Sequence, residues 1–157
     1  MKKTLELQKR KSLLEGTPGI QIRLDRLNQV LDMMISYQEK IPVALSNDFG
    51  HRSPMASKFT DVASVFDAIH FAKKSLKKWM KSEKRSASSP FNLFGAKAYI
   101  QYQPLGTVGV ISPWNFPINL TFAPLAGIFS AGNRAMIKPS EITPETSNLM
   151  KKMVSEF

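Results

Sequence analysis

TVGVISPWNFPINLTFAPLAGIFSAGNRAMIKPSEITPE, residues 107–145, is the part of the sequence from which the fold can be predicted. It contains two short runs of apolar and β-branched residues, 107–111 and 134–137, of the kind that form buried strands. Residues 118–131 between them make an apolar stretch of helix length, which ends at Gly132 and an asparagine, a typical helix stop. A strand, a helix and a second strand are therefore predicted in direct succession.

A further helix is predicted to begin at Thr143, which would cap it, because Pro144 suits the first helical turn. Strand, helix, strand and helix in so short a span predict a parallel β-α-β crossover and an α/β fold class. Ligands of such sheets lie at the carboxyl ends of the strands. The loops 112–117 and 138–141 are therefore the expected binding site.

The first half of the chain is predicted to be helical. Apolar residues recur there at three- and four-residue steps in three stretches, which are residues 5–14, 20–45 and 62–80. Pro42 predicts a break late in the second stretch, and residues 48–54 have the composition of a loop. Thr60 or Asp61 is expected to cap the third helix. These helices would form an arm ahead of the α/β segment.

The composition of the chain changes after Arg85. Residues 86–96 combine serines with proline and glycine and predict a connector, and residues 98–103 have the aromatic and β-branched content of a strand. We therefore expect a helical arm and connector over residues 1–95 and the start of a second unit over residues 96–157.

Composition also limits the function classes. The chain has 157 residues, of which 43% are hydrophobic, and this suits a globular domain and disfavours disorder. It has no cysteine, which excludes a disulfide framework, a cysteine-ligated metal and a cysteine nucleophile on this chain; no metal site is expected. The start lacks the apolar core of a signal peptide, and no run approaches the roughly 18 apolar residues of a membrane span. A cytoplasmic location is therefore expected.

Positive charge gathers in residues 71–85, within a chain of net charge +10. Glu83 is the one acid of this run, and its basic residues are Lys73, Lys74, Lys77, Lys78, Lys81, Lys84 and Arg85. One interpretation is a face that binds nucleic acid or an anionic membrane surface, with Trp79 as a stacking platform. The other is the solvated side of an amphipathic helix whose apolar face ends at Trp79 or Met80, and the apolar spacing favours it.

The first of the two expected ligand loops holds an asparagine in a stiff backbone. Pro113 and Pro117 bracket Trp114 and Asn115 and restrict where the Asn115 amide can point. A rigid amide donor at a strand end can stabilise an oxyanion, because the donor is in place before the charge develops. Alternatively, Asn115 is a turn residue that satisfies the local backbone.

The second ligand loop holds a cation and an anion three positions apart, Lys138 and Glu141. Such a pair can donate to and accept from the hydroxyls of a ribose. The alternative is an ordinary exposed ion pair of a loop.

Together the two loops resemble a known family. Residues 103–147 are similar to the first nucleotide-binding segment of the NAD(P)-dependent aldehyde dehydrogenase superfamily, in the loop PWNFP, the GN ahead of the second strand and the loop KPSE. Upstream, ALSNDFGHRS (residues 44–53) and YQPLG (residues 102–106) are most similar to the coniferyl aldehyde dehydrogenase group. The resemblance implies a helical arm followed by the first β-α-β-α part of a Rossmann-like nucleotide-binding domain, truncated here.

The resemblance also implies roles for individual residues. The asparagine of PWNFP lends its amide to the family's oxyanion hole, which would make Asn115 a catalytic residue. The other matched positions would contact the cofactor, and they are Ile111, Ser112, Pro113, Trp114, Lys138, Ser140 and Glu141. Because an acid beside the ribose suits the free hydroxyls of NAD better than a 2′-phosphate, NAD is expected and NADP stays open.

The family's reaction, by the same resemblance, oxidises an aldehyde to a carboxylic acid, here coniferyl aldehyde or a related aromatic or aliphatic aldehyde. A cysteine thiolate attacks the aldehyde, hydride passes to the nicotinamide, and a glutamate-activated water releases the acid. In the family that cysteine and that glutamate belong to downstream segments, and this chain ends inside the helix that follows KPSE. We therefore expect the N-terminal part of such an enzyme, inactive by itself.

A homo-oligomer is expected, without nucleic acid as a partner. Residues 98–103 resemble part of the family's oligomerisation hairpin, and a shortened nucleotide-binding domain would expose sheet edges and apolar helix faces. A monomeric mass in light scattering would contradict this expectation.

Overall fold

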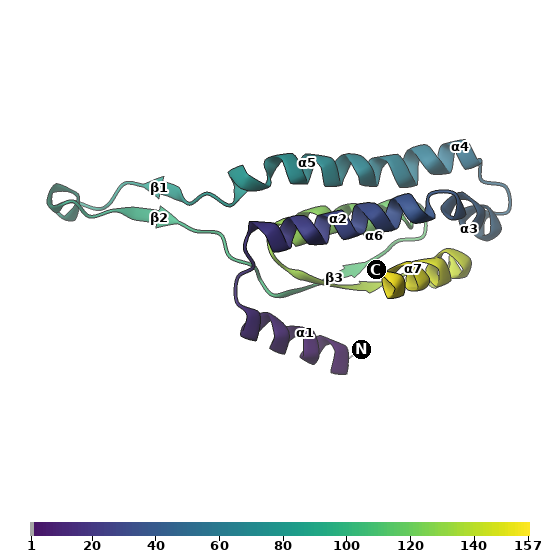
Figure 1. Cartoon of the computed structure of the whole chain (residues 1–157), viewed down its shortest axis with the longest axis horizontal. Helices are drawn as coiled ribbons and strands as arrows, with labels where there is room; N and C mark the ends of the chain where they lie inside the picture. The colour runs from purple at the N-terminus through teal and green to yellow at the C-terminus, as the bar shows by residue number, and fades with distance from the viewer. Residues whose placement is uncertain (1) are drawn as a thin grey trace.

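The structure, a computed structural model, describes residues 2–157 (Figure 1). Its helical half contains α1 (Lys2–Glu15), α2 (Ile20–Tyr37), α3 (Lys40–Phe49), α4 (Pro54–Ser57), the π-helical segment η1 (Lys58–Ala63) and α5 (Ser64–Trp79). A hairpin follows, made of β1 (Glu83–Arg85), the 3-10 turn η2 (Phe91–Phe94) and β2 (Ala98–Ile100). The last part contains β3 (Thr107–Ile111), α6 (Asn119–Ser130), β4 (Arg134–Lys138) and α7 (Pro144–Glu156).

The last four elements form the predicted β-α-β-α unit. Strands β3 and β4 pair in parallel, in a register that runs from Thr107 opposite Arg134 to Ile111 opposite Lys138. Helix α6 is the crossover between them, and its ends differ from the predicted bounds by one residue. The α/β fold class and the parallel crossover are therefore confirmed.

The first half is helical, as predicted, with one difference. The expected helix 20–45 is two helices, because the chain turns between Tyr37 and Lys40. Pro42 lies in the first turn of α3, where its missing N–H group costs no helical hydrogen bond. Helix α3 also includes Asp48 and Phe49, two residues of the expected loop. Gly50 follows with a φ of 82°, a backbone conformation that stops the helix.

The third helix begins earlier than predicted. Ser53 occupies its N-cap, and the chain stays helical from Pro54 through the π-helical segment η1 into α5. The expected cap at Thr60 or Asp61 is therefore wrong, because both residues lie inside a continuous helix. Their polar side chains are used in contacts with other parts of the chain, described below.

The lysine-rich helix is amphipathic, as its spacing predicts. Five of its apolar positions are buried, and they are Val62, Val65, Ile69, Ala72 and Leu76. At the end of this face Met80 packs against the core, whereas Trp79 is 43% exposed and meets Phe71 edge-to-face. The helix ends at Trp79, so Lys84 and Arg85 lie on β1 and do not extend the helical basic face. The expectation that nucleic acid is not a partner of this face stays untested, as does the alternative that it binds there.

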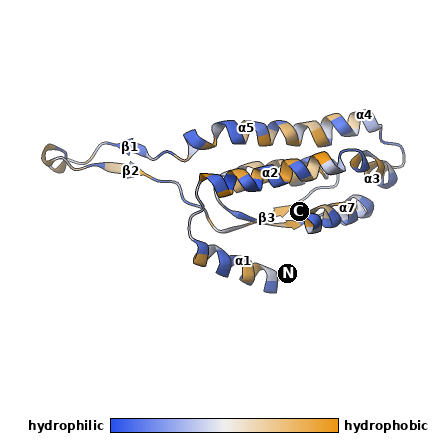
Figure 2. Ribbon diagram, in the orientation of Figure 1, coloured by the Kyte–Doolittle hydropathy of each residue, from blue (hydrophilic) through white to orange (hydrophobic). Residues whose placement is uncertain are grey.

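Strands β1 and β2 form a hairpin that extends away from the helices (Figure 1). The pairing is antiparallel, with Glu83 opposite Ile100, and the hydroxyl of Tyr102 donates to the Glu83 carboxylate at 3.0 Å. The observed strand β2 is thus shorter than the predicted strand 98–103. Its partner β1 could not be predicted, because β1 consists of polar residues. Part of the hairpin and its tip are orange, and so hydrophobic, in Figure 2. Leu93 and Phe94 at the tip are 80% and 84% exposed.

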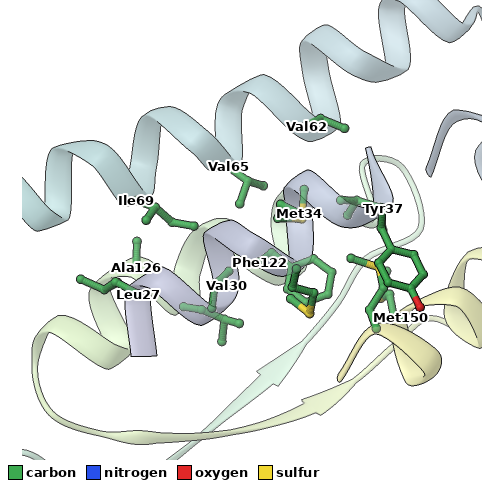
Figure 3. Packing of buried hydrophobic residues seen from close by; sticks show 14 of the residues in the cluster. Leu27, Val30, Met34, Tyr37, Val62, Val65, Ile69, Phe122, Ala126 and Met150 are labelled. Carbon is green, nitrogen blue, oxygen red and sulfur yellow. The ribbon is translucent and has the colours of Figure 1, made fainter. Parts of the chain in front are cut away.

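The hydrophobic core joins the two halves of the chain. Figure 3 shows Val65 and Ile69 of α5 facing Leu27 of α2 and Phe122 of α6. Met150 and Met153 of α7 are also buried in this cluster. The helical half therefore holds α6, and through α6 the strand ends, in a fixed position.

Gly132 turns the chain from α6 into β4 and is the glycine with the least space. Its φ is +86°, and an added Cβ would lie 3.0 Å from Pro18 and 3.1 Å from the guanidinium of Arg23. Arg23 cannot move away easily, because it is buried and donates to the carbonyls of Pro18 at 2.9 Å and Ser130 at 2.7 Å.

We expect Gly132→Ala to lower the free energy of unfolding by about 1–3 kcal/mol, the cost of a strained backbone conformation. Urea denaturation measures this change. Gly127→Ala is the control, because Gly127 lies inside α6 with open space around its Cα, and there alanine should add up to about 1 kcal/mol. Equal stability of the two variants would contradict the role of Gly132.

Tyr37 links α2 to α7, because its buried hydroxyl donates to the carboxylate of Glu156. This hydrogen bond, together with burial, raises the pKa of Tyr37 to about 12. A raised folded-state pKa gives stability that is fully present below the unfolded value of about 10 and is lost as the pH rises toward 12.

We therefore expect the free energy of unfolding to fall between about pH 10 and pH 12, and Tyr37→Phe to reduce that slope. Urea denaturation at several alkaline pH values, compared with the exposed control Tyr99→Phe, measures the effect. Parallel pH profiles of the Tyr37→Phe chain and the unchanged chain would contradict it.

Candidate functional site at the carboxyl ends of β3 and β4

The two predicted ligand loops lie side by side. The backbone N–H of Ser112, just after β3, donates to the carbonyl of Lys138, the last residue of β4, at 3.0 Å. This bond continues the parallel pairing by one step beyond β3. The residues that follow each strand therefore start from neighbouring points at one edge of the sheet.

Most side chains of the first loop are accessible. Ile111 is 82% exposed and Trp114 is 50% exposed, and Pro113 and Asn115 are exposed as well. Ser112 differs, because its hydroxyl is buried and pairs with the hydroxyl of Thr121 in α6 at 2.5 Å. Ser112 can therefore contact a ligand through its backbone, while its side chain fixes the loop to α6.

Asn115 is held through its backbone by a distant arginine. The Arg52 Nη1 group donates to the Asn115 carbonyl at 3.1 Å, and Asn115 is an exposed residue whose side-chain amide takes no part in this bond. The guanidinium of Arg52 also lies 5.1 Å from the ring centre of Phe49 and 5.0 Å from that of Phe116. Sequence reasoning missed Arg52, whose only signal was its place in the upstream stretch 44–53.

Asp61 is the partner of Arg52 and is fully buried, with its carboxylate 2.8 Å from Arg52 Nη2. It accepts from the Thr60 hydroxyl at 3.1 Å and from the backbone N–H of Asn119 at 3.2 Å. Burial raises the pKa of Asp61, and the Asn119 N–H, the Arg52 charge and the Thr60 hydroxyl oppose that shift. Because Asn119 begins α6, the Asp61 carboxylate caps that helix from another element.

In the second loop Lys138 and Glu141 form an ion pair at the surface, with side chains 52% and 78% exposed. The hydrogen bond from Lys138 is the main reason that the pKa of Glu141 is lowered. Ser140 is buried, and its hydroxyl accepts from the Ile142 N–H at 3.2 Å. Lys138 and Glu141 are thus available to a ligand, whereas the Ser140 hydroxyl shapes the loop.

Helix α7 is not capped by the Thr143 side chain, contrary to the sequence prediction. The Thr143 hydroxyl is buried with no hydrogen-bond partner among residues 2–157. Asp48 supplies the cap instead, because its carboxylate accepts from the backbone N–H groups of Glu145 at 3.0 Å and Thr146 at 2.8 Å. Both helices that follow the ligand loops are therefore capped by aspartates of the helical half.

A hollow of about 330 Å³ lies beside the first loop. Phe116 and Asn119 line it from the α6 side, and Phe59, Thr60 and Asp67 line it from η1 and α5. The two phenylalanines give it aromatic walls. Sequence reasoning did not predict this hollow, because its two sides come from segments about 55 positions apart in the chain.

The described residues show two further properties that bear on the site. Among residues 2–157, no three acidic or histidine side chains come close enough to share a metal ion. In the same part of the chain, no helix has the length and apolar content needed to cross a membrane.

A parallel β-α-β unit with polar loops at the carboxyl ends of its strands defines an α/β class of fold, in which ligands lie at that edge of the sheet. A model described as the aldehyde dehydrogenase family matches residues 16–157 of this chain. The chain belongs to the aldehyde dehydrogenase family.

Two curated relatives resemble the chain closely. A probable coniferyl aldehyde dehydrogenase from Caulobacter vibrioides is 52% identical over 157 residues, covering 99% of this chain and 32% of the relative. The coniferyl aldehyde dehydrogenase of a Pseudomonas species, strain HR199, is 44% identical, covering 98% of this chain and 31% of the relative. The chain therefore spans about a third of the length of these relatives.

Solved structures share the fold. The AldH of Staphylococcus aureus in its substrate-bound state superposes with a TM-score of 0.89 at 33% identity, covering 99% of this chain and 33% of that one. A succinic semialdehyde dehydrogenase from Streptococcus pyogenes, solved in complex with NADP+, has a TM-score of 0.71 at 21% identity, covering 96% and 30%. The second likeness shows the fold alone.

Proposed function

We propose that this chain is the N-terminal part of an enzyme that oxidises an aldehyde to a carboxylic acid with NAD(P)+. The observation that carries the proposal is the junction of the two loops. The Ser112 N–H bond to the Lys138 carbonyl brings the asparagine loop and the lysine–glutamate loop to one edge of the sheet. Membership of the aldehyde dehydrogenase family supports an oxidoreductase.

Asn115 is proposed as the oxyanion donor. Its side chain is exposed at the end of β3, and Pro113 and Pro117 restrict the backbone on either side. An amide that is already oriented can donate to the aldehyde oxygen as negative charge develops there, without a cost of reorganisation.

Lys138 and Glu141 are proposed to hold the adenosine ribose of the cofactor, which supplies the electron acceptor for the oxidation. Their chemistry fits, because an ammonium group donates and a carboxylate accepts, and both are exposed at the end of β4. Ile111, Pro113 and Trp114 would form the wall of the cofactor cleft. The acid favours NAD over NADP, since a carboxylate repels a 2′-phosphate.

The Glu141 assignment predicts a change in cofactor use, measured in a chimera in which this chain replaces the matching third of the Caulobacter vibrioides relative. We expect Glu141→Gln to raise the KM for NAD+ about 10- to 100-fold, because one hydrogen bond to a charged group contributes roughly 1.5–3 kcal/mol. The KM for NADP+ should rise less. Glu145→Gln, at a nearby exposed acid, is the control. Equal changes in both variants would remove Glu141 from this role.

The proposed substrate is an aromatic aldehyde, of which coniferyl aldehyde is the first candidate. The relatives named coniferyl aldehyde dehydrogenases support this choice. The hollow beside Asn115 also supports it, because Phe59 and Phe116 can stack against an aromatic ring.

The 157 residues by themselves are proposed to be inactive, because they contain no cysteine to attack the aldehyde. We also propose that the chain has two parts. Residues 1–95 would be a helical arm and connector, and residues 96–157 the start of a nucleotide-binding domain. The core joins both parts, so the division does not imply separate folding. A cytoplasmic location is likewise part of this proposal.

The protein is also proposed to form homo-oligomers through the β1–β2 hairpin. The hairpin extends from the body of the molecule and exposes Phe91, Leu93 and Phe94 at its tip (Figure 1). A cluster of exposed apolar side chains is typical of an interaction surface.

Aldehyde oxidation by the chimera tests the proposed function. We expect oxidation of coniferyl aldehyde at a rate comparable to that of the unchanged Caulobacter vibrioides relative, and faster than that of an aliphatic aldehyde. The 157-residue chain alone should show none. A folded chimera that binds no NAD(P)+ and oxidises no aldehyde would contradict the proposal.

A further inference from the structure

We propose that Arg52, held by Asp61, is a positioning residue that fixes the 112–117 loop in the conformation that presents the Asn115 amide. This inference rests on the proposed function of Asn115. It concerns a residue 63 positions away from that asparagine, in the short segment between α3 and α4.

The guanidinium of Arg52 contacts the 112–117 loop and the η1 segment at the same time. Its Nη1 group donates to the Asn115 carbonyl at 3.1 Å, and its Nη2 group donates to Asp61 at 2.8 Å. A planar guanidinium can make both bonds in one fixed orientation, which an ammonium group cannot do. The two bonds of Arg52 thereby hold Asn115 at a fixed place relative to Asp61.

Aromatic rings hold the same guanidinium in place. Phe49 at the end of α3 and Phe116 in the loop lie 5.1 Å and 5.0 Å from it, within the range of a cation–π contact. Because Phe116 directly follows Asn115, the loop is held by a ring contact as well as by a hydrogen bond. The side chain of Arg52 is only 15% exposed, so water competes little for these contacts.

Asp61 gives Arg52 a rigid anchor. It is fully buried, and Arg52, Thr60 and the backbone N–H of Asn119 all donate to its two carboxylate oxygens. It lies in the π-helical segment η1, and π-helical turns occur frequently at functional sites. Helix α5, which continues from η1, is packed into the core.

The loop has little else to hold it at this point. Pro113 has no N–H group, and among the hydrogen bonds of residues 2–157 the one from Arg52 is alone in tying residues 113–115 to another element. Since Arg52 contacts the Asn115 backbone and not its amide, it acts through position and makes no contact with the reacting atoms.

The test uses the 157-residue chain with Trp79→Phe, which leaves Trp114 as the single tryptophan. Acrylamide quenching of Trp114 fluorescence then reports on the loop. We expect Arg52→Ala to raise the quenching constant by up to about twofold, because Trp114 is already 50% exposed. Arg52→Lys keeps a charge beside Asp61, so we expect this variant to fold, and it should raise the constant by a smaller factor.

Two comparisons show that the change comes from the lost guanidinium of Arg52. Arg85→Ala, at an exposed arginine of the hairpin, should leave the constant unchanged. Guanidinium chloride far below denaturing concentrations should restore the Arg52→Ala value toward normal, and the same concentration of sodium chloride should not. Unchanged quenching in both Arg52 variants, or equal recovery in both salts, would overturn the inference.

This result is independent of the proposed function, because no aldehyde or cofactor is present in the measurement. If the loop loosens as expected but Asn115→Ala leaves the turnover of the chimera unchanged, Arg52 positions the loop and the proposed function fails. If the loop does not loosen, the inference about Arg52 fails and the proposed function of Asn115 stands by its own test.

Discussion

Asn115→Ala in the chimera is expected to lower the turnover of aldehyde oxidation roughly 100- to 1,000-fold, the loss typical of removing one oxyanion donor. The amide donates most strongly when negative charge develops on the aldehyde oxygen, so its removal acts on the transition state. The KM for the aldehyde should therefore change little. Steady-state kinetics at saturating cofactor measure both quantities.

The control for this experiment is Asn148→Ala, because Asn148 is an exposed asparagine of α7 away from the ligand loops. Its turnover should equal that of the unchanged chimera. A folded Asn115→Ala chimera that binds cofactor normally and keeps full turnover would show that the asparagine is a turn residue and no more.

Asp61→Ala is expected to have the largest effect on stability. Removing one partner of a buried ion pair leaves the other charge unpaired, which typically costs about 3–5 kcal/mol. In this chain the change also removes the acceptor for the first N–H group of α6. Urea denaturation of the 157-residue chain should show the loss as a lower midpoint at constant slope.

Glu39→Ala is the matched control for Asp61, because Glu39 pairs with Lys58 of the same η1 segment at 2.7 Å but is exposed. An exposed pair contributes no more than about 1 kcal/mol. If Asp61→Ala and Glu39→Ala destabilise the chain equally, the buried carboxylate has no special part in the fold.

The β-α-β unit could be predicted from sequence because its signals are local. Apolar runs of strand length flank an apolar run of helix length, and Gly132 marks the turn between helix and strand with a backbone conformation that glycine favours. The parallel pairing follows from the length of the crossover. The bounds of β3, α6 and β4 were consequently close to those observed.

The helix caps could not be predicted, because they come from distant residues. The sequence alone predicts caps at residues next to the helices, which are Thr60 or Asp61 for the third helix and Thr143 for the last. In the structure Asp61 caps α6, and Asp48 caps α7 from 97 positions away. Only the packing of the helical half against α6 and α7 brings these carboxylates to the helix starts.

The candidate site shows the same division between local and distant signals. Asn115, Lys138 and Glu141 could be predicted because they follow the two expected strands and belong to loops that resemble those of a known family, and the structure exposes all three at one edge of the sheet. Ser112 and Ser140 belong to the same loops, but their hydroxyls are buried in structural hydrogen bonds. Arg52 carried no signal beyond its place in the stretch 44–53, because its partners lie on three separate segments.

A crystal structure of the chimera with NAD+ and an aldehyde would show whether the two loops form one site. We expect the hydroxyls of the adenosine ribose within hydrogen-bond distance of Lys138 and Glu141, and the Asn115 amide directed at the aldehyde oxygen. A cofactor whose ribose lies on another element, or an aldehyde oxygen that receives no hydrogen bond from Asn115, would contradict the proposed function.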